Sequence, residues 1–207
     1  MLKIHFDSHI ADPPDDSCRN RRKSLFHRFV RNEDGTSAIE FSLLALPFLI
    51  VLFASLETFF AFAGEQLLAN ATETLSRKVR TGEITSTTSQ EDFRKLFCDE
   101  ISIIMTCSAT EAKTADRLFV DVRSYTKFSD IPTTIPRKSG STGDFDPTGF
   151  AFTPGGPNTI NMVRAYYRWE VMTDLIRPYI TNLRSAGSSM PNDYLMVATS
   201  AFRNENF

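Results

Sequence analysis

The sequence predicts an α+β protein in which a long N-terminal, membrane-spanning helix packs on a small antiparallel sheet. Residues 41–63 are almost uniformly apolar, and apolar side chains at helical spacing continue to about residue 80. Later segments alternate as strands do. A hydrophobic content of 42% and a charged content of 23% exclude a wholly disordered or collagen-like chain. The net charge of -2 gives no basic excess that would indicate a nucleic-acid partner.

The composition divides the 207 residues into three regions. Residues 1–35 form a polar, locally basic leader, residues 36–82 a long helix that includes the apolar run, and residues 83–207 an α+β domain outside the cytoplasm. The leader carries a cluster of basic side chains uninterrupted by acids, namely Arg19, Arg21, Arg22, Lys23, Arg28 and Arg31. The positive-inside rule therefore places the leader in the cytoplasm and the C-terminal domain across a bacterial inner membrane.

The apolar run of residues 41–63 is long enough to cross that membrane. Its 23 residues carry one charge, Glu57. As a helix they extend about 34 Å at roughly 1.5 Å per residue, which exceeds a hydrocarbon thickness of about 30 Å. Pro47 lies inside the run and removes one helix hydrogen bond, which membrane helices tolerate.

Three fates are open for this segment. It can remain as a simple anchor, or signal peptidase can cut after Ala63, where Ala61-Phe62-Ala63 has the small-x-small form. A cut after Gly35 would instead remove the basic leader and retain the helix.

Glu40 has two readings because a carboxylate at the mouth of a membrane helix is costly. In the first, Glu40 faces headgroups and water and lies in the first helical turn, where the helix dipole favours an acid. In the second, cleavage after Gly35 creates an amino terminus at Thr36, and Glu40 pairs with that ammonium on a neighbouring subunit.

The junction resembles the prepilin-peptidase site of type IV pilin-like proteins. Gly35 is followed by Thr36-Ser37-Ala38-Ile39-Glu40-Phe41, and this spacing is similar to that of the tight adherence (Tad) pseudopilins, in particular the TadE-like family. Residues 118–125, 166–169 and 201–207 also resemble segments of that family.

The resemblance implies a pilin-like fold and a role as a minor pilin-like subunit in assembling a type IVb pilus of the Tad system. It implies no enzyme and no cofactor. Gly35 and Thr36 would form the processing site, and Glu40 and Phe41 would act in assembly. The implied partners are the inner membrane, a prepilin peptidase, other pilins and the proteins of the Tad assembly machine.

The long helix is expected to continue past the membrane to Arg80. Leu67, Ala71, Leu75 and Val79 recur every four residues and form one apolar stripe, and Gly82 is a plausible stop. Two helices with a hinge near Gly64 remain an alternative.

A second helix is predicted from the cap Ser89 to about Ile104. Its expected buried stripe consists of Phe93, Leu96, Phe97, Ile101 and Ile104. Cys98 lies on this helix and Cys107 follows it, and a cysteine pair in an exported domain predicts a disulfide.

Three strands are predicted, over residues 117–127, 158–172 and 194–203. A long loop of residues 131–157 separates the first two, and a short helix is expected over residues 177–183. On the second strand, Tyr166, Tyr167 and Trp169 are expected to pack in the core rather than line a binding surface.

Paired acids leave one enzymatic alternative. All three histidines, His5, His9 and His27, precede the apolar run, so the exported domain holds no histidine for a nucleophile pair or a metal site. A membrane-tethered periplasmic hydrolase would have to use carboxylates such as Asp144 with Asp146 or Glu170 with Asp174.

Overall fold

The computed structural model describes residues 36–138, 143–174, 177–183 and 193–207. The chain divides into two compact units, Met1–Val51 and Leu52–Phe207. Helix α2 (Thr36–Arg80) is continuous, so there is no hinge at Gly64. In the first unit, the described part of α2 exposes its apolar side chains, as Ile39 and Phe41 do at 67% and 73%.

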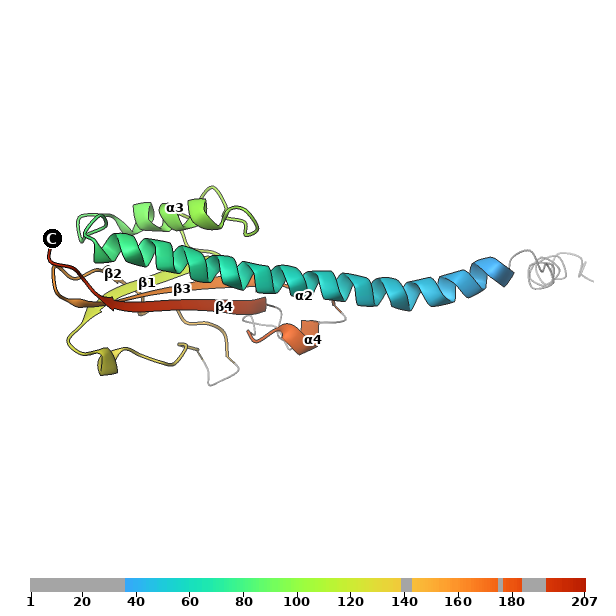
Figure 1. Cartoon of the computed structure of the whole chain (residues 1–207). Coiled ribbons are helices and arrows are strands. Elements are labelled where there is room, and N and C mark those ends of the chain that lie inside the picture. Colours follow the sequence, from blue (N-terminus) through green and yellow to red (C-terminus); the bar gives the residue numbers. More distant parts are fainter. Residues whose placement is uncertain (1–35, 139–142, 175–176, 184–192) are drawn as a thin grey trace, which may run out of the picture. The chain divides into compact units, whose positions relative to one another are not determined.

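The second unit combines the C-terminal part of α2 with a four-stranded mixed sheet (Figure 1). The strands are β1 (Leu118–Tyr125), β2 (Phe152–Thr153), β3 (Ile160–Glu170) and β4 (Asp193–Arg203), in the order β2-β1-β3-β4. The pairs β1·β3 and β3·β4 are antiparallel, as predicted. The sheet is mixed rather than purely antiparallel because β2, from the long loop, pairs in parallel with β1.

The main core lies between the sheet and the helices α2 and α3 (Gln90–Ile101). Leu68, Ala71, Leu75 and Val79 form the buried stripe of α2, with Leu67 only partly buried at its edge. Opposite this stripe, alternate strand residues point inward: Leu118, Val120, Val122, Val163, Ala165, Tyr167, Met196 and Ala198. This alternation confirms the strand prediction for residues 117–127.

A second, smaller core covers the other face of the sheet. Phe145, from the long loop, packs against Tyr166, Leu183 and Leu195. Its ring lies 4.8 Å from that of Tyr166 between centroids. The two cores explain why the central strand β3 is buried from Ile160 to Tyr167. The tyrosines therefore pack in the core, as predicted.

The helix ends follow local sequence signals. Ser89 caps α3 by accepting a hydrogen bond from the Asp92 amide at 3.0 Å. Helix α3 ends at Ile101, three residues before the predicted end, and Ile104 is only partly buried. The short helix α4 covers Arg177–Ile180.

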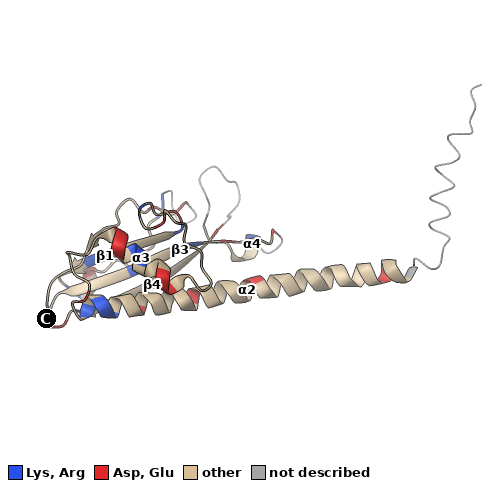
Figure 2. Cartoon of the chain, turned by 90° about the horizontal axis from the view of Figure 1, so that it is seen from above, with Lys and Arg blue, Asp and Glu red and all other residues tan. Residues whose placement is uncertain are grey.

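Gly82 ends α2 with a left-handed turn, at φ +80°. The Gly82 amide donates to the Val79 carbonyl and the Glu83 amide to the Lys78 carbonyl, which together form a Schellman motif. In Figure 2 the ribbon of α2 is blue, the colour of Lys and Arg, at this end. The basic residues of the last turn are Arg77, Lys78 and Arg80, which suit the helix dipole.

The C-terminal segment fastens the same end of α2 to the sheet. The Glu205 amide donates to the Arg80 carbonyl at 2.9 Å. The buried Asn204 side chain donates to the carbonyls of Gly155 and Gly156. The Phe207 ring lies against Gly82. These contacts hold the last residues of the chain against the second unit.

Candidate assembly and membrane surface

The start of α2 carries the residues singled out for processing and assembly. Thr36 is the first residue of α2, whereas Gly35 and the rest of the leader lie outside the described residues. Glu40 and Phe41 are exposed. The first turn of α2 as described contains no acid, and Glu40 is the fifth residue of the helix. Both roles considered for Glu40 stay predictions.

Helix α2 is the one helix among the described residues that is long and apolar enough to cross a membrane. Its most apolar window is not buried in the structure. The exposed side chains include Leu43, Leu44, Leu46, Phe48, Val51, Phe53, Phe59 and Phe62. An unburied helix of this composition fits a single-pass membrane protein.

Glu57 is the one charged residue of the apolar run, and its carboxylate has hydrogen-bond donors that were not predicted from the sequence. Its carboxylate accepts hydrogen bonds from the Met172 amide at 2.6 Å and from the Thr173 amide at 3.0 Å. Both amides lie in the connection between β3 and α4. The sequence feature that could have indicated such donors is the single acid in the apolar run, because a lone carboxylate there requires neutralisation or hydrogen-bond donors. This feature does not identify the residues that supply the donors.

Two further carboxylates of α2 face strand β4. The Tyr194 hydroxyl donates to Glu65, and the Ser200 hydroxyl donates to Glu73 at 3.2 Å. Burial, together with the bond to Glu65, raises the pKa of Tyr194 to about 12. Polar contacts therefore join α2 to β4 and to the connection after β3 along the length of the second unit.

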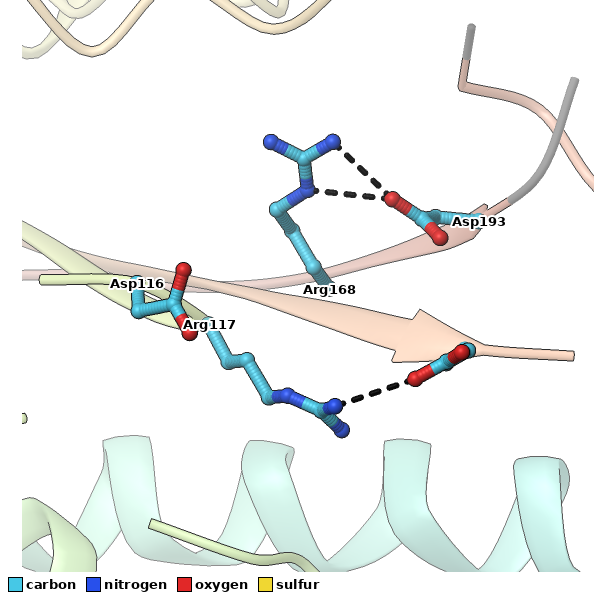
Figure 3. Close-up of a pocket in the computed structure, with 5 residues that line it drawn as sticks. Asp116, Arg117, Arg168 and Asp193 are labelled. Atoms are coloured by element: carbon cyan, nitrogen blue, oxygen red, sulfur yellow. Dashed lines mark hydrogen bonds and ion pairs between the residues drawn. The ribbon is translucent and has the colours of Figure 1, made fainter. Parts of the chain in front are cut away.

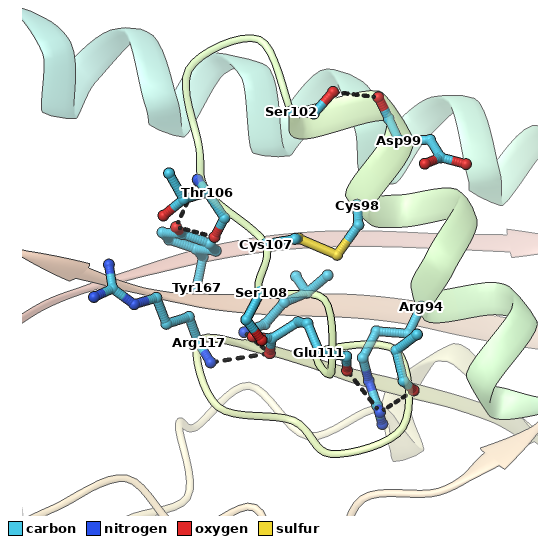
Figure 4. Close-up of a disulfide and its surroundings, with 12 residues drawn as sticks. Arg94, Cys98, Asp99, Ser102, Thr106, Cys107, Ser108, Glu111, Arg117 and Tyr167 are labelled. Carbon is cyan, nitrogen blue, oxygen red and sulfur yellow. Dashed lines mark hydrogen bonds between the residues drawn. A yellow bond between two sulfur atoms is a disulfide. The ribbon is translucent and has the colours of Figure 1, made fainter.

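The structure contains the predicted disulfide between Cys98 and Cys107, which joins α3 to the following loop (Figure 4). The same loop is anchored to the sheet by Tyr167, whose hydroxyl donates to the Thr106 carbonyl at 2.9 Å and accepts from the Thr106 amide at 3.2 Å.

A buried carboxylate, Glu111, organises the rest of this loop. One oxygen of Glu111 accepts from three successive amides, those of Asp116, Arg117 and Leu118, at 2.8–3.0 Å. The buried Arg94 guanidinium donates to the carbonyls of Glu111 and Ala112, and its burial lowers the pKa of Arg94. Glu111 was not predicted, because an acid in a polar loop carries no sequence signal of burial.

The four acids of the hydrolase alternative each make an ion pair or a local hydrogen bond. Arg117 pairs with Glu170 at 3.0 Å, and Arg177 pairs with Asp174 at 2.8 Å. Asp144 lies 3.6 Å from Arg168. The hydroxyl and amide of Thr148 donate to Asp146 and lower the pKa of that carboxyl, which disfavours a general acid.

Glu170 also lines a cavity of about 290 Å³ with Asp116, Arg117, Arg168 and Asp193 (Figure 3). Arg168 binds Asp193 through two nitrogens, at 2.9 and 3.2 Å. Arg117 pairs with Glu170 and Arg168 pairs with Asp193 at the ends of β1, β3 and β4, as in a structural ion-pair network. Among the described residues, no group of three or more His, Cys, Asp or Glu side chains could hold a metal ion.

These features define a protein with a membrane-type N-terminal helix and a pilin-like α+β domain. The family model described as TadE-like protein matches residues 35–77, which confirms the resemblance to the TadE-like family over this segment. The match indicates a protein associated with the Tad pilus. No curated protein and no solved structure gives a significant match to the chain.

Proposed function

We propose that the chain is a minor pilin-like subunit, a pseudopilin, that takes part in assembling a Tad type IVb pilus. A prepilin peptidase on the cytoplasmic side cuts between Gly35 and Thr36. The observation that best supports this proposal is that the family match begins at Gly35 and covers the exposed apolar length of α2. The domain after α2 then lies in the periplasm.

In this proposal α2 serves two environments in turn. In the membrane its exposed apolar side chains contact lipid, and the subunit is stored there. After extraction the same side chains pack against other pilin helices. The described residues supply a folded domain that packs on α2, whereas the work of extraction comes from the partner proteins of the assembly machine.

Glu40 and Phe41 act at the start of this helix. Cleavage leaves an ammonium at Thr36, and Glu40 pairs with the ammonium of a neighbouring subunit. Phe41 packs in the helix bundle, which agrees with its exposure of 73% in the isolated chain. A carboxylate and an ammonium that pair in an apolar bundle set the register between helices, because an unpaired charge there is costly.

The test replaces Glu40 with Ala or with the neutral, similarly sized Gln. Insertion should be at least as efficient as in the wild type, because a membrane carboxylate is a cost. Fibres should be lost or strongly reduced. Membrane levels by immunoblotting and fibre counts by electron microscopy measure the two effects.

Ser42→Ala is the matched control, because Ser42 lies two residues away and only bonds its own helix, at the Ala38 carbonyl. That variant should assemble as the wild type does. Wild-type fibre numbers in both Glu40 variants would instead favour an interfacial role in which Glu40 faces headgroups and water.

A further inference from the structure

The connection between β3 and α4 lies at the level of the apolar part of α2. The hydrogen bonds from Met172 and Thr173 to Glu57 fix this level. Exposed apolar side chains of α2 lie on both sides of Glu57 along the helix: Leu52, Phe53 and Leu56 before it, and Phe59, Phe60 and Phe62 after it. The exposed apolar surface of α2 therefore continues past the point where the connection touches it.

Two apolar side chains, one in this connection and one on α4, are strongly exposed and could contact lipid. Met172 is 88% exposed and Tyr179, on α4, is 86% exposed. They are the two most exposed large hydrophobic side chains among the described residues. A tyrosine suits the boundary between lipid and water, where its ring and hydroxyl meet different surroundings.

The charged groups near Met172 limit how deeply this part of the chain can enter a bilayer. Asp174 and Arg177 form an ion pair at 2.8 Å, with the Asp174 side chain 86% exposed. A charged pair is costly in hydrocarbon but favourable among headgroups. The Glu57 carboxylate and the two amides satisfy one another, which removes the cost of an unpaired acid and of free backbone groups at this depth.

We propose that residues 171–174 and α4 form a second membrane contact, in which Glu57 holds Met172 and Tyr179 in the headgroup region of the outer leaflet. The chain would then touch the bilayer with α2 and with this turn, and the membrane surface would fix the orientation of the folded domain. This proposal rests on the insertion of α2 and does not depend on the assembly role proposed above.

The test places one environment-sensitive fluorophore at a time on the full chain in phospholipid vesicles. A Cys18→Ser background with the disulfide intact leaves each introduced cysteine as the single free thiol. The probe sites are Met172→Cys and Tyr179→Cys. Phe128→Cys is the control, because Phe128 is 52% exposed and follows the end of β1 that pairs with Ile160, at the far end of β3 from Met172.

The proposal predicts blue-shifted emission at residues 172 and 179, with a loss of emission when the vesicles contain nitroxide-labelled lipid. Emission at residue 128 should stay at the value in water and show no such loss. Water-like emission at all three sites would overturn the proposal, and would instead favour contact of this turn with other subunits in the fibre.

A second set of variants tests Glu57. Glu57→Ala should abolish the quenching at residue 172, whereas Glu57→Gln, which retains an oxygen acceptor, should preserve most of it. An intact Cys98–Cys107 disulfide and unchanged emission at residue 128 report that the domain is still folded. Equal quenching at residue 172 in wild type and Glu57→Ala would contradict the role assigned to Glu57.

Discussion

At the scale of single residues, carboxylates on α2 do different work according to their partners. Glu57 and Glu65 accept hydrogen bonds from the domain, whereas Glu40 is exposed. Its pairing with a neighbouring subunit is a proposal. The lone charge in the apolar run was visible in the sequence, but its partners were not. Met172 and Thr173 bind Glu57 through backbone amides, and an amide donor leaves no trace in residue type.

The contact between Tyr194 and Glu65 predicts a pH dependence. The pKa of Tyr194 in the folded chain, about 12, lies above the ordinary value of 10.0, so folding favours the neutral phenol. This stabilisation is complete below about pH 10 and is lost as the pH rises through about 12. Spectrophotometric titration should show a late-ionising phenol that Tyr194→Phe removes. An unchanged titration curve in that variant would contradict the assignment.

Gly82 is predicted to tolerate no side chain. Its φ of +80° disfavours any L-residue, and a Cβ would lie 2.5 Å from the Phe207 ring. Gly82→Ala should lower the free energy of unfolding by about 1–2 kcal/mol from the backbone strain alone. Chemical denaturation of the full chain in detergent measures the change.

Gly149→Ala is the matched control, since nothing lies within 4 Å of a Cβ there. The double variant Gly82→Ala/Phe207→Ala relieves the steric contact but not the strain, and should remain less stable than Phe207→Ala. Equal stability of those two variants would contradict the argument from backbone strain.

At the scale of elements, strongly periodic segments could be predicted and short or irregular ones could not. The apolar stripe of α2 and the alternation of Leu118, Val120 and Val122 predicted the ends of α2 and β1 to within one or two residues. Strand β2 escaped prediction because its two residues are too few to alternate. Phe145 escaped because a core residue supplied by a loop rich in Gly and Pro has no periodic neighbours.

The disulfide between Cys98 and Cys107 joins helix α3 to the loop in which Glu111 accepts three backbone hydrogen bonds. Replacing Cys98 and Cys107 with Ser should lower the free energy of unfolding by about 2–3 kcal/mol, the chain-entropy value for a loop of this size. Denaturation of the oxidised wild type against the double variant measures the loss. Non-reducing peptide mapping of freshly quenched cells should find the pair linked, and two free thiols would overturn the prediction.

At the scale of the whole molecule, one helix serves both units of the chain. Its N-terminal part carries the junction and the exposed apolar surface, and its C-terminal part forms the core with the sheet. The candidate processing site was readable from the sequence because a peptidase motif is a local pattern of residue types. The sequence did not reveal the contact between Glu57 and the β3–α4 connection, because it joins residues more than 100 positions apart.

The central proposal for the whole chain is that the leader, residues 1–35, is removed by cleavage after Gly35. The proposed cleavage after Gly35 would remove 35 of the 207 residues and leave 172, with the membrane helix retained. The net charge falls from -2 to -3, because the leader holds seven basic and six acidic side chains. A bulky replacement of Gly35 should block the cut, since a peptidase pocket shaped for a small residue excludes it.

Intact-mass measurement of the membrane-extracted protein, with N-terminal sequencing, tests the account most directly. Cleavage at the proposed site predicts a 172-residue chain that begins Thr-Ser-Ala-Ile, at Thr36. A 144-residue product beginning Gly-Glu-Gln-Leu, from a cut after Ala63, would contradict it, as would an intact 207-residue chain in the membrane.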